Sequence, residues 1–327
     1  MTANQATWPR ARPPSRGAAL LVAMLVLTLV STLAAGMVWQ QSRAIGVESA
    51  ERTRSQAGWI LGGALDLGRI ILRVDARTPG VDHAGEPWGT RLQEASLSSL
   101  LAQDRNNNVE NAPEAFLGGG IRDAQERYNL RNLIDPATKK LVPAELSALT
   151  RICETSGVSP ATAQTLANGL LAARLAELGQ EQGPDEAATE GAALMPRSFE
   201  QLTWLGLDAA TLKQLRPFVD LLPEPTPLNI NTASAELLAA VIELDAATAK
   251  RLERRRPFKS LNDARPEVPR EGALDPKRLS VGSNYFEITG SLRMEGRVLE
   301  ERLLVQRRGR EIVPLARTRQ SIDPNPN

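Results

Sequence analysis

The sequence predicts an α+β protein in which a helical block interrupts a domain built from one long N-terminal helix and a small antiparallel sheet. Three observations predict this class. An apolar stretch near the N-terminus continues into an amphipathic one, residues 143–265 show helical spacing throughout, and strand-like runs follow residue 282. At roughly 150 residues per domain, the 327 residues suggest about two folded units.

The N-terminal helix begins in a segment that is long enough to cross a membrane. Residues 18–39 carry no charge, and about 20 apolar residues span a bilayer. Arg10, Arg12 and Arg16 precede this segment, so the N-terminus is expected in the cytoplasm and the remainder outside it. A cleaved secretory signal would have a shorter apolar region, and a buried core helix would need protein on every side.

The helical pattern continues beyond the apolar segment. Residues 43–73 contain no proline, and their apolar residues recur at helical spacing between polar ones. We therefore expect one continuous helix from Ala18 to Arg73, half in lipid and half packed on a folded domain. Thr78-Pro79-Gly80 would end it.

The remaining elements follow from caps, turns and periodicity. A helix is expected at 92–101, a flexible turn at 118–120 and a short strand within 121–135. The helical block would comprise 144–155, 160–178, 199–205, 209–215, 233–242 and 246–254. The caps of this block are expected to be Ser159, Asp208, Thr232 and Asp245.

The C-terminal part is expected to form strands. Apolar runs at 285–289, 298–305 and 312–315 flank a hairpin turn at 307–310. Pro314 would place the last strand at an edge, because proline cannot donate to a central ladder. Two segments are expected outside the packed structure: a polar loop at 179–196 and a disordered tail at 319–327.

Composition excludes several classes of function. Lys and Arg number 39 against 38 Asp and Glu, which argues against a surface built wholly for nucleic acid. One cysteine, Cys153, excludes an internal disulfide and cysteine-based metal sites, and it falls on an apolar helix face as a core residue. His83 lies near Asp82 and Glu86 without further catalytic groups. Nucleophile and dinucleotide motifs are missing from the sequence, so no enzyme is expected.

The leader resembles that of type IV pilin and pseudopilin precursors: a basic segment ends in Gly17, and an apolar helix starts at Ala18. This resemblance implies cleavage of the Gly17–Ala18 bond by prepilin peptidase. Most members carry glutamate at the fifth mature position, where this chain has Val22. A carboxylate in lipid is costly unless it is paired, and in a pilus its partner would be the amine of a neighbouring subunit. Val22 cannot form that pair.

Two internal motifs, IRDAQERYNLRNLI at 121–134 and the segment 216–241, resemble signatures of the K family of minor pseudopilins in type II secretion. Asp123, Arg127 and Asn129 occupy the motif positions of the first. The resemblance implies a pilin-like fold with a large inserted all-α domain that contains a helix-hairpin-helix or SAM-like part. It also implies a place at the tip of the periplasmic pseudopilus, initiating or capping assembly for the export of folded proteins across the outer membrane.

The family also implies partners, a location and a domain order. The partners would be other minor pseudopilins of the tip complex, the major pseudopilin, prepilin peptidase and the inner-membrane assembly platform, with no nucleic acid. The protein would cross the bacterial inner membrane once, with its bulk in the periplasm. The predicted order is a cleaved cytoplasmic leader at 1–17, a transmembrane helix at 18–42, a first pilin-like part at 43–135, the inserted domain at 136–279, C-terminal strands at 280–318 and the tail at 319–327.

Calcium is the one cofactor that the sequence brings into question. Asp104, Asn106 and Asn108 have the oxygen spacing of the first half of a calcium loop, but later EF-hand positions do not match. The family implies an acidic calcium-binding loop, whose counterpart here contains Asp185, Glu186 and Glu190. The alternative for both segments is a solvated polar loop.

The segment LNINTASAELLAAV, residues 228–241, also resembles the start of a helix-hairpin-helix DNA-binding unit. Such units hold phosphate on backbone N–H groups of a glycine-containing hairpin. Residues 243–247 contain no glycine and two carboxylates. A membrane-anchored DNA-binding or DNA-uptake protein is therefore the second hypothesis, and a membrane-anchored periplasmic hydrolase is the third.

Overall fold

The computed structural model describes residues 16–78, 80–101, 114–182, 194–268, 270, 272–294 and 296–322. The chain divides into two units, residues 1–59 and residues 60–327. Helix α1, Arg16–Asp75, contributes to both. The continuous helix expected from Ala18 to Arg73 is confirmed, because no proline or capping residue interrupts this stretch.

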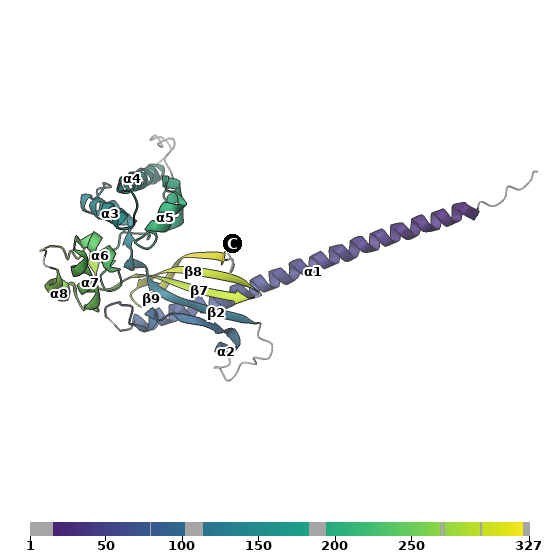
Figure 1. The fold of residues 1–327 in the computed structure, drawn as a ribbon, viewed down its shortest axis with the longest axis horizontal. Helices are drawn as coiled ribbons and strands as arrows, with labels where there is room; N and C mark the ends of the chain where they lie inside the picture. The colour runs from purple at the N-terminus through teal and green to yellow at the C-terminus, as the bar shows by residue number, and fades with distance from the viewer. Residues whose placement is uncertain are drawn as a thin grey trace, which may run out of the picture. The chain divides into compact units, whose positions relative to one another are not determined.

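A five-stranded antiparallel sheet forms the pilin-like part of the second unit. Its order is β1-β2-β7-β8-β9, and β2, β7 and β8 lie side by side (Figure 1). The strands are β1 (Leu92–Ser96), β2 (Ala115–Asp123), β7 (Tyr285–Met294), β8 (Arg297–Arg308) and β9 (Glu311–Ile322). Since β2 pairs directly with β7, everything between them in the sequence is an insertion at one strand pair.

The C-terminal end of α1 packs on one face of this sheet. Leu65 and Leu72 of α1 share a buried core with Phe286 and Ile288 of β7. A Cβ atom built on Gly68 would lie 2.5 Å from Cγ2 of Ile288. Glycine at this position therefore lets the helix backbone approach the sheet closely.

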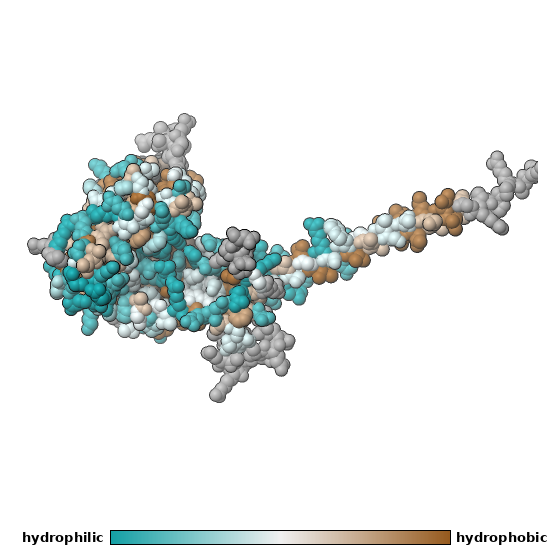
Figure 2. Space-filling model, in the orientation of Figure 1, coloured by the Kyte–Doolittle hydropathy of each residue, from teal (hydrophilic) through white to brown (hydrophobic). Residues whose placement is uncertain are grey.

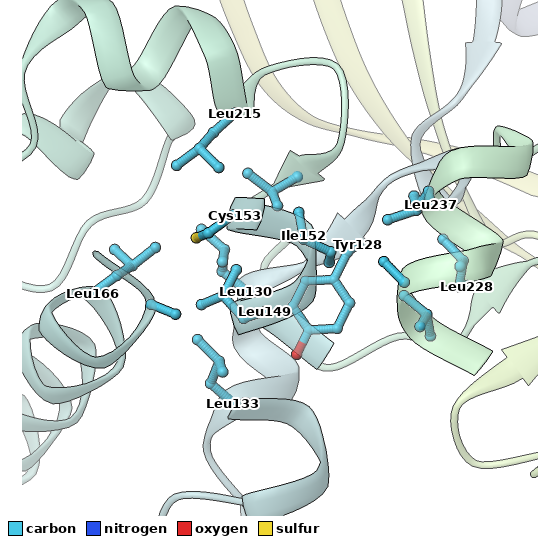
Figure 3. Close-up of a cluster of buried hydrophobic side chains, with 14 of the residues drawn as sticks. Tyr128, Leu130, Leu133, Leu149, Ile152, Cys153, Leu166, Leu215, Leu228 and Leu237 are labelled. Atoms are coloured by element: carbon cyan, nitrogen blue, oxygen red, sulfur yellow. The ribbon is translucent and has the colours of Figure 1, made fainter. Parts of the chain in front are cut away.

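The inserted region has a hydrophobic core of its own. Figure 3 shows Leu130, Leu149, Cys153, Leu166 and Leu215 from different segments pointing toward one another. The helices of this region are α3 (Pro143–Thr155), α4 (Ala161–Gln182), η5 (Phe199–Leu205), α5 (Ala209–Leu215), α6 (Ala235–Ile242), α7 (Ala246–Arg254) and α8 (Leu261–Ala264). Cys153 is buried there, and burial raises the pKa of its thiol to about 11, which suits the predicted core role.

The region is not purely helical, and it begins earlier than predicted. It also contains two short parallel strand pairs. In one, β3 (Tyr128–Asn129) pairs with β4 (Val219–Asp220), and in the other, β5 (Leu228–Asn229) pairs with β6 (Leu279–Ser280). Tyr128 and Leu133 are buried in the helical core, although both precede the predicted boundary at residue 136. The chain enters the helical core at Tyr128, shortly after β2 ends at Asp123.

Short helical turns complete the described elements. They are η1 (Pro87–Gly89), α2 (Leu97–Leu101), η3 (Ala124–Glu126), η4 (Leu130–Leu133) and η6 (Arg265–Glu267). The strand predicted within residues 121–135 is therefore shorter than expected, because two of these turns lie inside the segment.

Three further local predictions were wrong. The helix expected at 92–101 is helical only from Leu97, because its first half pairs with β2 as β1. Residues 118–120 form no turn and lie inside β2, where a side chain on Gly119 would collide with the carbonyl oxygen of Thr289. The tail expected at 319–327 is structured at its start, because residues 319–322 continue β9 against β8. The three glycines at 118–120 therefore allow β2 and β7 to pair closely.

The expected hairpin and edge strand are confirmed. Gly309 has a positive φ of 61° in the turn between β8 and β9, where glycine avoids strain. Pro314 lies in β9, the outermost strand on that side, beside an irregularity in the register. The expected caps Asp208 and Asp245 accept hydrogen bonds from Thr211 and Thr248.

Candidate functional site

The predicted processing residues lie at the start of α1. Gly17 and Ala18 fall within its first turn, and Val22 follows in the same helix with 60% of its surface exposed. Figure 2 shows hydrophobic residues along this stretch of the helix. One described helix, Ala18–Asp75, is long and apolar enough to cross a membrane by length and composition. The cleavage bond itself stays a prediction.

The two internal signatures meet in a buried polar cluster, although about 100 residues separate them in the sequence. Its centre is Asp123, at the end of β2, which is 1% exposed. Its Oδ2 atom accepts hydrogen bonds from Nδ2 of Asn229 at 2.9 Å, Oγ1 of Thr232 at 2.6 Å and Oγ of Ser283 at 2.6 Å. The cluster therefore joins β2, the second signature and the start of β7.

Burial dominates the electrostatics of this cluster. Desolvation raises the pKa of Asp123 from 3.8 to about 6, and the hydrogen bonds from Ser283, Thr232, Gln125 and Asn229 oppose that rise. Without the carboxylate, the hydroxyl of Ser283 and the backbone N–H of Gln125 would lose their acceptor in the interior, whereas Nδ2 of Asn229 also donates to the carbonyl oxygen of Asp82 at 3.1 Å. The cluster therefore holds the end of β2, the second signature and the residues before β7 together.

Asn129, the third motif residue, likewise joins the first signature to a segment distant in the sequence. Its Nδ2 atom donates to the carbonyl oxygen of Glu224 at 2.7 Å and to Oγ1 of Thr226 at 3.0 Å. Its Oδ1 atom accepts from the backbone N–H of Leu222 at 3.2 Å and of Arg131 at 3.0 Å. Asn129 thereby fixes the proline-rich connector that carries the second signature, and no aspartate could supply its donors.

A second tie, which sequence reasoning missed, secures the end of α1. Arg307 of β8 donates from Nη1 to Oδ2 of Asp75 at 2.9 Å and from Nη2 to Oδ2 of Asp82 at 2.5 Å. Asp82 also accepts from the backbone N–H of Ser283 at 2.7 Å, which links this tie to the Asp123 cluster. Burial raises the pKa of Asp75, with Glu86 and Asp82 adding to the rise. The sequence shows Arg307 only as one of several arginines before a turn.

One predicted role in the second signature needs correction. Thr232 does not cap α6, because its hydroxyl donates to Asp123, and Ser234 accepts from the N–H of Leu237 as the cap. Asn231, in the same signature, also bonds to a residue distant in the sequence. Its Oδ1 atom accepts from the N–H of Phe258, and its Nδ2 atom donates to the carbonyl oxygen of Phe258. The long-range partners compete successfully with local capping.

The hairpin between α6 and α7 is unsuited to phosphate. Glu243 occupies it in a left-handed conformation with φ of 60°. Its carboxylate pairs with Arg151, at 3.1 Å, and with Arg270. A helix-hairpin-helix unit would present backbone N–H groups to a phosphate at this place. The carboxylate would repel that phosphate, so this geometry argues against the DNA-binding hypothesis.

The metal candidates fall outside the described residues. These are Asp104, Asn106, Asn108, Asp185, Glu186 and Glu190. Within the described ranges, no three His, Cys, Asp or Glu side chains gather closely enough to hold a metal ion. His83 closes a loop, where its Nδ1 atom accepts from the N–H of Gly85 at 3.1 Å. Calcium binding therefore stays a prediction.

The comparisons with known proteins agree with the two signatures. Family models described as type II secretion system protein K match residues 126–224 and 228–282. The chain is 29% identical to protein K of the type II secretion system of Pseudomonas aeruginosa, covering 88% of this chain and 87% of that protein. It is 27% identical to the protein K of Dickeya chrysanthemi, covering 91% and 94%.

A solved structure shares the fold. A chain in the crystal structure of the GspK-GspI-GspJ complex from the type 2 secretion system of enterotoxigenic Escherichia coli matches with a TM-score of 0.63. The match covers 83% of this chain and 98% of that chain at 19% identity. A crystal structure therefore contains a similar fold over that share of the chain.

Proposed function

Because this chain belongs to the type II secretion system protein K family and is a minor pseudopilin, we propose that it lies at the tip of the periplasmic pseudopilus. There it initiates or caps assembly for the export of folded proteins across the outer membrane. The GspK-GspI-GspJ complex of enterotoxigenic Escherichia coli supports two other minor pseudopilins as its partners.

The observation that carries this proposal is that α1 is apolar on two opposite faces. Leu61, Leu65 and Leu72 are buried. Leu67, Ile70 and Val74 follow the i, i+3, i+7 spacing of a single face and are 55%, 51% and 55% exposed. An apolar stripe of this kind on a helix outside the bilayer marks an interaction surface. In the proposed filament it contacts the helices of neighbouring subunits.

The N-terminal part of α1 supports an anchored subunit. Its apolar residues 18–39 match the thickness of a bilayer, and the basic residues before them favour a cytoplasmic N-terminus. The bulk of the chain would then lie in the periplasm. Prepilin peptidase would cut between Gly17 and Ala18, and the assembly platform and the major pseudopilin would act on the processed subunit.

Val22 supports a position at the tip. An aliphatic side chain at the fifth mature position needs no amine from a subunit ahead of it, whereas a carboxylate in lipid would. The inserted helical region adds bulk that would hinder another subunit from stacking beyond it. Both features suit a subunit that ends the filament.

The test is to make the exposed stripe of α1 polar. Leu67→Gln combined with Ile70→Gln should reduce secretion and the co-purification of other minor pseudopilins, because the helices lose their apolar contact. Thermal unfolding should stay near that of the wild type, since both side chains are exposed. Leu194→Gln, at a 67% exposed leucine outside the helix, is the matched control. Normal secretion by the double variant would refute the proposed packing.

A further inference from the structure

A cleft of about 700 Å³ lies on the face of the sheet opposite α1, where the sheet meets the start of β4. Gly120 of β2, Thr289 of β7 and Arg302 of β8 lie opposite one another across the strands there. Their neighbours Ile121, Ile288 and Leu303 point into the core under α1. Because Gly120 and Thr289 are small, they leave space on the face of the sheet opposite α1. Its basic and small lining residues are Arg91, Gly120, Arg127, Arg216, Thr289 and Arg302, and two glutamates, Glu287 and Glu300, line it as well.

The arginines of the cleft divide into two groups. Arg122 donates to Glu126, and Arg302 donates from Nε to Oε1 of Glu300 at 2.7 Å. Arg91, Arg127 and Arg216, by contrast, donate no side-chain hydrogen bond to any described residue. The second group therefore retains donors for a ligand.

Arg127 is the strongest indication, because it is only 4% exposed. Its Nε and Nη2 atoms are buried without a hydrogen-bond partner among the described residues. Its Nη2 atom lies 3.2 Å from Oδ2 of Asp220, and Nη1 of Arg216 lies 3.8 Å from the other oxygen of that carboxylate. Arg127 thus has Asp220 as its one carboxylate neighbour among the described residues, whereas Arg216 also lies 3.6 Å from Glu200 and 4.0 Å from Glu287. Buried donors without acceptors cost free energy, which an incoming anion would recover.

Arg91 and Arg216 border the same space. The side chain of Arg91 lies across Gly120, whose built Cβ would be 3.3 Å from its Cγ atom. Arg216 stacks on Phe199, with its Cζ atom 4.6 Å from the ring centroid, and its nearest carboxylate oxygens are 3.6 Å or more away. Guanidinium groups bind carboxylates through paired N–H donors.

We propose that this cleft binds an acidic segment of another polypeptide, with a carboxylate of that segment accepting from Arg127 and Arg91. The size of the cleft favours a peptide over an inorganic ion, since pockets of several hundred Å³ enclose ligands of many atoms. The proposal goes beyond the role of α1 in the filament and does not depend on it.

The experiment uses the full chain in detergent micelles at about 0.15 M salt, where long-range charge effects are screened. The probe is a fluorescent peptide with glutamates at alternate positions, and the comparison peptide has glutamines there. Anisotropy should show binding of the glutamate peptide only. Arg91→Gln should weaken that binding about tenfold, the worth of one charge-assisted hydrogen bond.

Two further variants test whether binding depends on the guanidinium donors of the cleft or on net charge alone. Arg127→Lys keeps the charge but loses the paired donors, so it should also weaken binding. Arg310→Gln removes an exposed arginine in the turn between β8 and β9 and should leave affinity unchanged. Equal binding of both peptides, or undiminished binding by Arg91→Gln, would overturn the proposal. Binding of inorganic phosphate without binding of the peptide would overturn it too, since the site would then take a free anion.

Discussion

Single polar residues join distant parts of this chain. Asp123 receives donors from Asn229, Thr232 and Ser283, which come from two other segments. The carboxylate has moved out of water, so its donors replace the water that it lost. A residue with this role cannot be exchanged for another of similar size, because each partner needs an acceptor.

The raised pKa of Asp123 makes a prediction about pH. Between its ordinary value of 3.8 and about 6, the folded chain retains a proton that the unfolded chain loses. The contribution of Asp123 to the free energy of unfolding is therefore complete below about pH 4 and falls as the pH rises through 6, by up to about 3 kcal/mol. Urea unfolding, followed by tryptophan fluorescence, should show this fall in the wild type relative to Asp123→Asn.

Asp208 provides a control of opposite sign. Hydrogen bonds from Thr211 lower the pKa of this capping residue, so its contribution is lost as the pH falls. The difference in stability between the wild type and Asp208→Asn should therefore grow with pH. A difference between the wild type and Asp123→Asn that is constant from pH 4 to pH 7 would contradict the buried-carboxylate account.

Glycines in α1 affect how closely this helix approaches the sheet. Along α1, Gly68 faces Ile288 of β7, whereas Gly63 has no atom within 4 Å of a built Cβ. Two glycines five residues apart therefore have different roles in one helix. The first permits packing against the sheet, and the second only weakens the helix.

We expect opposite effects from the same substitution at these two glycines. Gly63→Ala should stabilise the protein by up to about 1 kcal/mol, because alanine favours the helix and meets no neighbour. Gly68→Ala should destabilise it by about 1–3 kcal/mol, because the methyl group must displace Ile288 or the helix. Thermal unfolding of the two variants in one detergent measures both. A stabilised Gly68→Ala protein would show that the helix does not pack closely there.

The molecule combines a long N-terminal helix with a sheet and a helical insertion at one strand pair. The insertion leaves the pairing of β2 with β7 intact, because its ends are held by the Asp123 cluster and by two short parallel strand pairs. A large helical region can therefore be accommodated without changing the sheet. This arrangement suits a filament subunit that carries extra bulk on one side.

Processing of the chain supplies a prediction for the full-length protein. Co-expression with prepilin peptidase should yield a membrane-extracted protein whose N-terminus is Ala18, measured by intact mass and N-terminal sequencing. Gly17→Trp should retain Met1, because it replaces the small residue before the predicted bond with a bulky one. Gly36→Trp, in the same helix, is the control and should be processed normally. A cut beyond Ala35 would instead indicate an ordinary secretory signal.

Several features could be predicted from the sequence because they depend on neighbours along the chain. The helix from Ala18 to Arg73, the caps Asp208 and Asp245, and the hairpin turn at Gly309 are local and were predicted correctly. The resemblance to type II secretion system protein K was also visible in the sequence, because the two signatures that carry it are contiguous strings of residues.

Only the tertiary structure decided the features that depend on distant partners. Residues 118–120 were expected to form a turn, but they pair with β7. Thr232 was expected to cap a helix, but its hydroxyl donates to Asp123. The arginines of the cleft come from separate segments, so no window of sequence gathers them. The sequence by itself therefore determines the long apolar helix, the helices with caps at Asp208 and Asp245, and the turn at Gly309, since 3.6-residue periodicity and capping act over a few residues. Which buried polar groups find partners, and which donors stay unsatisfied, is determined only when segments far apart in the sequence come into contact.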